Sequence, residues 1–307
     1  MATTVLAAPQ RRPWLRSNTG REALWAYLFL APNVALFLVF TLFPVLAGFG
    51  VSLLKWDLLQ PWRFVGLANY ARLAEDPDFH QILGNTFYYT FGVIPPQTAL
   101  ALLIAAGLNQ RVRGLTFYRT AFFVPVVTSE IAVSMVWQWL YQPEFGVINS
   151  MLQLVGLEGP KWLFSETWAM PSVIAVSVWK NVGYSIVIFL AAMQGVPEEL
   201  HEAGKIDGAG ALARFFHVTI PIITPAIFFV IVMSVIGSFQ VFGIIYVLTQ
   251  GGPAKATTVL VYYLYQNGFQ WFAMGYAAAI AYVLFGLVLI MTLIQWALRR
   301  RWVYGEL

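Results

Sequence analysis

The chain has 307 residues, of which 59% are hydrophobic and 10% are charged, and its formal net charge is +4. A soluble domain carries about 25% charged residues, so the composition excludes an ordinary soluble protein, and positive charge spread this thinly excludes a nucleic-acid-binding surface. Cysteine is absent, which removes disulfides, a thiol nucleophile and cysteine metal ligands.

Six apolar runs are each long enough to cross a bilayer as a helix, which takes about 20 residues. They cover residues 25–53, 86–108, 117–140, 169–193, 219–248 and 272–297. The first run is too long for the apolar core of a signal peptide, and no small-residue cleavage site follows it. The sequence therefore predicts an all-α integral membrane protein with a six-span domain over residues 25–300 and tails at 1–24 and 301–307.

The distribution of lysine and arginine predicts the orientation of these spans. The tails and the segments that precede spans three and five hold twelve of these residues, which are Arg11, Arg12, Arg16, Arg21, Arg111, Arg113, Arg119, Lys205, Arg214 and Arg299 to Arg301. The other loops hold five, which are Lys55, Arg63, Arg72, Lys161 and Lys255. Because positive residues stay on the cytoplasmic side, both termini are predicted to be cytoplasmic and the longer loops at 54–85, 141–168 and 249–271 to face outward.

An acidic segment, PEELHEAGKIDGAGALARFFHVTIPIITP, separates the fourth and fifth runs. Pro197 suits the start of a helix, glutamates favour the positive end of a helix, and Gly208 favours a turn. Asp207 is predicted to cap a second short helix over 209–216, and Pro225 to kink the fifth span. The alternative interpretation is a solvated loop, but the apolar Phe215–Phe216 pair beside a shaped bend favours a docking surface.

This segment resembles the cytoplasmic signature of permeases from binding-protein-dependent ABC importers. The residues that match the signature are Glu202-Ala203-Gly204, Gly208 and Val218 to Pro221, and Gly204 and Ile220 are small departures from it. Ile206 to Ala209 and the Phe pair match the carbohydrate-uptake branch, which includes maltose and glycerol-phosphate permeases. Two outer segments are similar too, FVGLANY (64–70) with Asn85-Thr86, and TQGGPAKATTVLVYYLY (249–265). The resemblance covers about residues 24–300 and implies a type I ABC importer permease core.

The resemblance implies that segment 197–217 is a coupling helix that docks on a dimer of cytoplasmic ABC ATPase subunits. It assigns this role to Glu199, Glu202, Ala203, Gly204, Asp207, Gly208, Ala209, Phe215 and Pro221. It also implies a second homologous permease subunit, an extracytoplasmic solute-binding protein and a bacterial or archaeal cytoplasmic membrane. This chain lacks a nucleotide-binding G-x-x-x-x-G-K-[ST] loop, because Gly204-Lys205 is followed by Ile206. ATP and magnesium are therefore expected on the separate ATPase.

Polar residues at mid-depth in spans four and five either pack helices or line a solute path. In maltose-type permeases the sugar site lies on these two spans, so the resemblance favours the path. It selects Trp179 and Tyr184 for stacking on sugar rings, Ser234 and Ser238 on one helical face, and Asn181 and Gln240 as weaker candidates.

Two charges, Glu130 and Lys180, lie within spans. Each is about 13 residues from the cytoplasmic end of its span, or about 20 Å at 1.5 Å per residue. Equal depth and opposite sign predict an ion pair, which lowers the cost of burial; the alternative is two separate positions in a solvated cavity.

The function predicted is the permease subunit of an ATP-driven importer for a sugar or oligosaccharide, with glycerol 3-phosphate or a related polyol as the alternative substrate. An ion-coupled secondary transporter is a more distant alternative, since Glu130 is the only carboxylate in a span. An enzyme is disfavoured, since H-E-x-x-H and G-x-S-x-G motifs are missing and the histidines lie outside the spans.

Overall fold

The computed structural model describes residues 18–110 and 114–303. Contacts divide the chain into two units, Met1–Val51 and Ser52–Leu307, so the boundary falls inside the predicted six-span domain. The predicted cytoplasmic residues Arg11, Arg12, Arg16, Arg111 and Arg113 lie outside the described residues.

The first unit is a single helical run that continues to the start of the second. It comprises α1 (Asn18–Phe37), a π-helical segment η2 (Leu38–Leu42) and α2 (Phe43–Ser52). The stretch from Glu22 to Ser52 is 31 residues long and contains an 18-residue window with a mean hydropathy of 2.4. A helix long and apolar enough to cross a bilayer therefore forms where the first apolar run predicts one.

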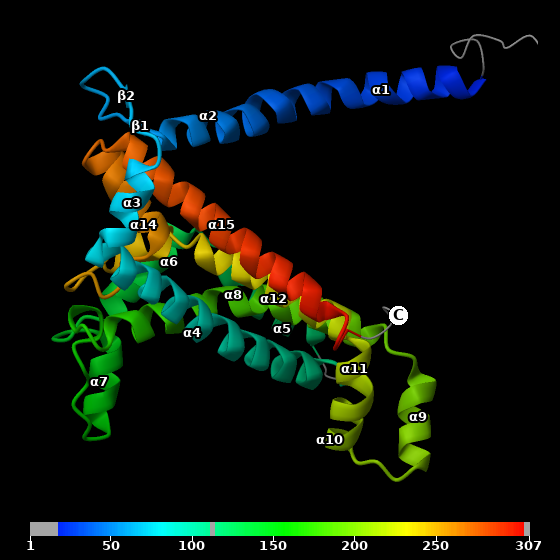
Figure 1. The fold of residues 1–307 in the computed structure, drawn as a ribbon. Helices are drawn as coiled ribbons and strands as arrows, with labels where there is room; N and C mark the ends of the chain where they lie inside the picture. The colour runs from blue at the N-terminus through cyan, green and yellow to red at the C-terminus, as the bar shows by residue number, and fades with distance from the viewer. Residues whose placement is uncertain (1–17, 111–113, 304–307) are drawn as a thin grey trace, which may run out of the picture. The chain divides into compact units, whose positions relative to one another are not determined.

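The second unit is a bundle of long helices with short helices at both ends (Figure 1). Its long helices are α4 (Pro77–Leu108), α5 (Leu115–Val127), α6 (Glu130–Leu140), α8 (Ala169–Gln194), α12 (Thr224–Phe239) and α15 (Met274–Arg299). One end carries the hairpin of β1 (Leu54–Lys55) and β2 (Arg63–Phe64) together with α3 (Ala68–Glu75), α7 (Val147–Leu154), η3 (Trp162–Phe164), α13 (Gly243–Leu248), α14 (Leu260–Tyr265) and η5 (Gln266–Gln270). The other end carries α9 (Glu198–Ile206), α10 (Ala211–Arg214), η4 (Phe215–Thr219) and α11 (Ile220–Ile222).

Among the described residues, four helices are long and apolar enough to cross a membrane, and two bent helix pairs bring the number to as many as six. The expectation of a straight third span over 117–140 is wrong, because α5 and α6 meet at 96°. Thr128 ends α5 in an extended conformation, and its hydroxyl donates to the carbonyl of Val124 at 2.7 Å.

The fifth predicted span, 219–248, is also divided. The helix from Ala211 to Ile222 meets α12 at 69°, beside Pro225, where a kink is expected because proline lacks the N–H of a helical hydrogen bond. The expectation that this span continues to 248 is wrong, because α12 ends at Phe239 and a separate helix, α13, begins at Gly243.

The core is built around the packing of α4 against α8. One cluster includes Val173, Val176 and Ile245, and a second cluster includes Ile186 and Phe189, which are fully buried. At Gly183 of α8, an added Cβ would lie 1.9 Å from the carbonyl oxygen of Phe122 in α5. Small residues let helix backbones approach this closely in membranes, so Gly183 sets the spacing of α5 and α8.

The outer-loop motifs tie distant segments together through the side-chain amides of two asparagines. The side-chain amide of Asn85 donates to the carbonyls of Lys255 and Thr258, at 2.8 and 3.0 Å, and that of Asn69 donates to the carbonyls of Ser52 and Leu54, both at 2.8 Å. These asparagines account for two of the sequence motifs, because a replacement would leave these carbonyls without the amide donors.

Asp76 joins three helices at the same end of the bundle. Its carboxylate accepts hydrogen bonds from the hydroxyls of Tyr263 and Tyr276, at 2.7 and 2.6 Å, and from the backbone N–H of Asp78. Partial burial by itself raises the pKa of Asp76, but the hydrogen bonds from Tyr276, Tyr263 and the backbone outweigh it, so the pKa lies below its ordinary value.

Gly183→Ala is expected to destabilise the protein by about 1–3 kcal/mol, because the added methyl group must push α5 away from α8. Gly107→Ala is the matched control, since an added Cβ there meets nothing within 4 Å and alanine favours a helix. Thermal unfolding of the purified protein in detergent measures both variants. Equal melting temperatures for Gly183→Ala and the wild type would contradict the close contact.

Candidate functional site

A polar cavity of about 470 Å³ opens between α4, α6, α8, α12 and the start of α13. Its polar lining residues are Tyr89, Gln97, Glu130, Ser177, Lys180, Asn181, Tyr184, Ser234, Ser238 and Gln240. Five of the six residues predicted for the solute path therefore line one cavity, which are Asn181, Tyr184, Ser234, Ser238 and Gln240.

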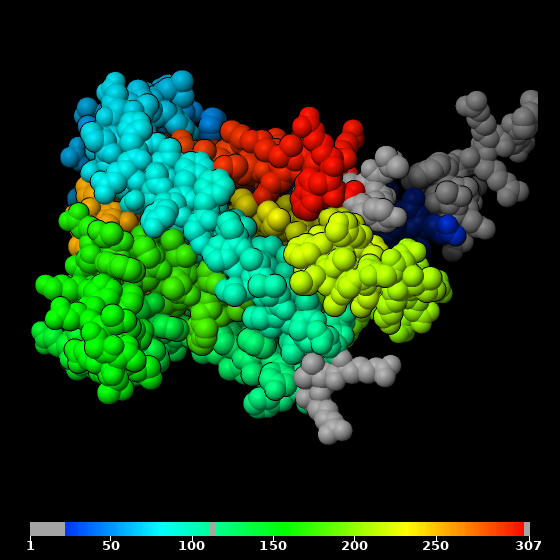
Figure 2. All heavy atoms as spheres, turned by 90° about the horizontal axis from the view of Figure 1, so that it is seen from below, coloured from blue at the N-terminus to red at the C-terminus, as the bar shows by residue number. Residues whose placement is uncertain are grey.

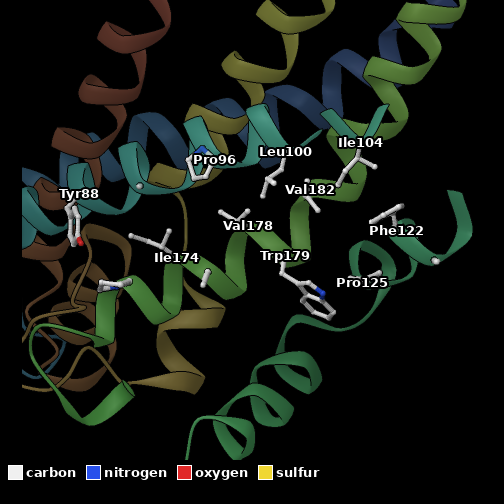
Figure 3. A pocket seen from close by; sticks show the side chains of 14 residues that line it. Tyr88, Pro96, Leu100, Ile104, Phe122, Pro125, Ile174, Val178, Trp179 and Val182 are labelled. Atoms are coloured by element: carbon white, nitrogen blue, oxygen red, sulfur yellow. The ribbon is translucent and has the colours of Figure 1, made fainter. Parts of the chain in front are cut away.

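Trp179 is the exception, because it lies on a different face of α8. Residues 177, 180, 181 and 184 follow helical spacing and share one face, whereas Trp179 lines a separate apolar pocket of about 830 Å³ between α4, α5 and α8 (Figure 3). Its ring packs against that of Trp137, with 5.4 Å between the ring centres. Trp179 and Tyr184, both predicted to stack on sugar rings, therefore line two different cavities.

Several polar groups of the cavity have no partner among the described residues. The side chains of Ser234, Gln240 and Tyr184 make no hydrogen bond there, whereas the Asn181 amide donates to the carbonyl of Ser177 at 3.0 Å and the buried Ser238 hydroxyl donates to that of Val235 at 2.9 Å. The cavity thus presents hydroxyl and amide groups that have no partner among the described residues.

Lys180 satisfies the broken end of α5. Its ammonium group donates to the carbonyls of Pro125, Val126 and Thr128, at 3.2, 3.4 and 3.3 Å, and the residue is only 8% exposed. The last carbonyls of a helix lack partners within the helix, and a cation is favourable at this negative end. Lys180 therefore supplies the partners that the break removes.

Glu130 performs the complementary task at the start of α13. Its Oε1 accepts from the backbone N–H of Ile244 at 2.8 Å, where the residue before the helix, Phe242, offers no capping side chain. Glu130 also lies in the first turn of α6, so its negative charge meets the positive ends of two helices. An added Cβ on Gly243 would lie 3.0 Å from the same Oε1, so this glycine leaves room for the carboxylate.

The predicted ion pair of Glu130 with Lys180 does not form in this structure. Both residues are described and both line the cavity, but they approach no closer than the 4 Å of an ion pair, and each bonds a helix end instead. The depth estimate behind the prediction assumed a straight third span, and the 96° bend removes that assumption.

Segment 197–217 forms a helical knob at the opposite end from α7 (Figure 1). The N–H of Ala209 bonds the carbonyl of Gly204 at 2.8 Å and the N–H of Gly208 bonds that of Lys205 at 3.0 Å, which is a Schellman C-cap. Gly208 takes the left-handed conformation, with φ +77°. The expectation that Asp207 caps the second helix is wrong, because Asp207 ends α9 and Gly210 precedes α10.

Arg214 fastens the two helices of the knob. Its guanidinium donates to the carbonyl of Ala209 at 2.6 Å, and its side-chain carbons would lie 3.2 Å from a Cβ on Gly204. The departure from the family pattern at Gly204 therefore gives Arg214 room to cross α9, so the bend is held by side-chain contacts as well as by the backbone.

The knob protrudes at the yellow-green end of the second unit (Figure 2), and its exposed residues include both charged and apolar ones. Glu199, Glu202 and Ala203 are exposed, as are the apolar side chains Leu200, Ile206, Leu212 and Phe216, with Ile206 87% exposed. Phe215, by contrast, packs on the cluster of Ile186 and Phe189, and the half-buried Pro221 lies in α11, just before the 69° bend. Phe215 therefore anchors the knob, whereas Phe216 is available to a partner.

Three features of the site were missed at the sequence level. Tyr89 and Gln97 line the cavity from α4, where their spacing of eight residues places them on one helix face and is the signal that could have found them. Arg214 was counted only for its charge, and no pattern in the sequence indicates its contact with Gly204.

Comparison with known proteins agrees with this architecture. Residues 84–304 match the family described as binding-protein-dependent transport system inner membrane component. The arabinooligosaccharides transport system permease protein AraP of Bacillus subtilis is 36% identical, over 88% of this chain and 86% of that protein. The lactose transport system permease protein LacF of Rhizobium radiobacter is 35% identical, over 93% of this chain and 99% of that protein.

The fold is also that of a solved structure, a bacterial alginate ABC transporter in complex with an alginate pentasaccharide-bound periplasmic protein. One chain of that structure superposes with a TM-score of 0.83 at 22% identity, over 94% of this chain and 98% of the other. The type I permease core predicted from the sequence is confirmed by this likeness.

Lys180→Met is expected to lower the melting temperature of the purified protein, because it leaves three carbonyls at the end of α5 without donors, at about 1–3 kcal/mol for each unsatisfied buried group. The control is Lys161→Met, since Lys161 is exposed in an outer loop. Unfolding followed by intrinsic tryptophan fluorescence gives both melting temperatures. If Lys180→Met melts no lower than Lys161→Met, the carbonyls do not depend on Lys180.

Proposed function

We propose that this chain, which belongs to the family of inner-membrane components of binding-protein-dependent transport systems, forms the solute path for a sugar or oligosaccharide in an ATP-driven importer. The observation that carries the proposal is the convergence of Asn181, Tyr184, Ser234, Ser238 and Gln240 on one cavity between α8 and α12. The relatives named for arabinooligosaccharides and lactose support a carbohydrate as the solute.

The chemistry of the cavity suits such a solute. Hydroxyl and amide side chains can donate to and accept from sugar hydroxyls, and the Tyr184 ring offers an apolar face. Val93, Met233 and Phe242 add apolar surface to the lining, and small-molecule sites combine such surface with convergent polar groups. Carriage of the solute through the membrane requires these groups to be exposed to each side in turn.

The knob of residues 197–217 is proposed to receive the driving force. Its exposed face combines Glu199 and Glu202, which can accept hydrogen bonds from a basic partner, with the apolar side chains of Ile206, Leu212 and Phe216. A separate pair of ABC ATPase subunits, which bind ATP and magnesium, is the proposed partner. A second homologous permease and an external solute-binding protein complete the proposed assembly.

The proposal is tested by reconstituting this chain with its partner permease, ATPase and binding protein in proteoliposomes. Solutes that stabilise the binding protein against heat are identified first, and their ATP-dependent uptake is then measured. We expect uptake of a carbohydrate that stops when ATP is withheld. Uptake that continues without ATP and follows an ion gradient would favour the secondary transporter instead.

Gly208→Val is expected to reduce uptake about tenfold, because a β-branched residue at φ +77° costs about 1–2 kcal/mol and distorts the bend of the knob. Gly210→Val is the matched control. It lies two residues away, has φ −65° and likewise meets nothing within 4 Å of an added Cβ. The amount of each variant in the membrane fraction is measured in parallel and is expected to match the wild type. Normal uptake by Gly208→Val would argue against a coupling role for the bend.

A further inference from the structure

We propose that Glu130 is a substrate-binding residue that restricts the cavity to uncharged glycans, and that Lys180 does not serve as an anion ligand. This inference rests on the proposed function and deepens it. It divides carbohydrate substrates into neutral sugars, which the cavity accepts, and uronate, phosphate or sulfonate sugars, which it rejects.

Among the described residues that line the cavity, Glu130 and Lys180 carry the only charges. Recognition of an anionic sugar requires cationic or N–H donors that are free to reach it. Whether each of these two side chains is free or already hydrogen-bonded therefore decides which charge the cavity accepts on its solute.

The donors of Lys180 are already used. An ammonium group has three N–H donors, and three backbone carbonyls of the α5 end lie 3.2–3.4 Å from Nζ. With 8% of the residue exposed, an incoming carboxylate or phosphate would have to displace these carbonyls. Their displacement would leave the broken helix end unsatisfied inside the membrane.

Glu130, unlike Lys180, keeps one polar atom free. Its Oε1 is fixed by the N–H of Ile244, whereas its Oε2 bonds none of the described residues, and the residue is exposed. A carboxylate accepts hydrogen bonds only, so the unpartnered Oε2, held in place through Oε1, binds the hydroxyl groups of a sugar. An anionic group at the same place would meet a like charge with no cation free to offset it.

The remaining lining groups fit a neutral polyhydroxyl solute. Ser234, Gln240 and Tyr184 have no partners among the described residues, and each can both donate and accept. Together with Glu130 they supply donors and acceptors for the hydroxyl groups of a sugar, whereas a phosphate or carboxylate would meet only neutral donors.

The cysteine-free sequence allows a direct test inside the cavity. Ser234→Cys places a single thiol in this chain, and its modification by N-ethylmaleimide is timed in the assembled complex in detergent, without the binding protein. The competitors are galactotriose and trigalacturonate, which differ only in replacement of each CH₂OH by a carboxylate. We expect galactotriose to protect the thiol at a concentration about tenfold lower than trigalacturonate, the factor that a charged hydrogen bond of about 1.5–3 kcal/mol supports.

Two variants separate binding from structure. Glu130→Gln keeps an oxygen for the N–H of Ile244 but removes the charge, and it is expected to bring the two protecting concentrations to within about threefold of each other. Lys180→Met is expected to leave their ratio unchanged, although it lowers the melting temperature. Glu158→Gln, in an outer loop and outside the cavity lining, is the control for a change of charge alone.

The outcomes are distinguishable. Stronger protection by trigalacturonate in the wild type, or loss of that protection in Lys180→Met, would overturn the inference while leaving a carbohydrate importer intact. Protection by neither competitor, together with no carbohydrate uptake in proteoliposomes, would overturn the proposed function and this inference with it. An unchanged ratio in Glu130→Gln would remove Glu130 from the binding site.

Discussion

The structure of the membrane-embedded site depends on one constraint, which is that a helix broken within a bilayer exposes backbone groups that lipid cannot satisfy. Two side chains meet this constraint at the two breaks that border the cavity. Lys180 donates to three carbonyls at the end of α5, and Glu130 accepts from the first turn of α13. Because both caps come from other helices, the breaks exist only in the assembled bundle, and the cavity forms between them.

This dependence explains what the sequence could and could not predict. Bilayer thickness fixes the length of an apolar run, so the spans are visible in composition, and α8 begins and ends within one residue of the predicted 169–193. The break at Thr128–Ser129 was missed because neither residue at the break is a glycine or a proline, although Pro125 lies one turn before it, and because its capping group, Lys180, is more than 50 residues away. The opposite charges of Glu130 and Lys180 at equal predicted depth suggested an ion pair. Each side chain instead bonds a helix end, whose backbone groups would otherwise lack hydrogen-bond partners.

The knob and the cavity belong to one continuous stretch of chain. Residues 198–239 run from α9 through the Schellman turn, α10, η4 and α11 into α12, which carries Ser234 and Ser238. Phe215 from the knob and Ile223 from the bend pack into the same buried cluster as Phe189 of α8. Close-packed interiors transmit displacement instead of absorbing it, so this cluster connects the knob physically to α8 and α12, which line the cavity.

The caps then determine how such a displacement spreads. Separation of α6 from α13 would break the hydrogen bond between the N–H of Ile244 and the Glu130 carboxylate. Separation of α5 from α8 would break those between Lys180 and the carbonyls of α5. Each buried group left without a partner costs about 1–3 kcal/mol. These hydrogen bonds therefore favour keeping α5 with α8 and α6 with α13. The two pairs join at Thr128–Ser129, where α5 and α6 meet at 96°. The cavity is lined by residues of both pairs, so a rearrangement that keeps each pair intact also keeps the hydrogen bonds of Lys180 and Glu130.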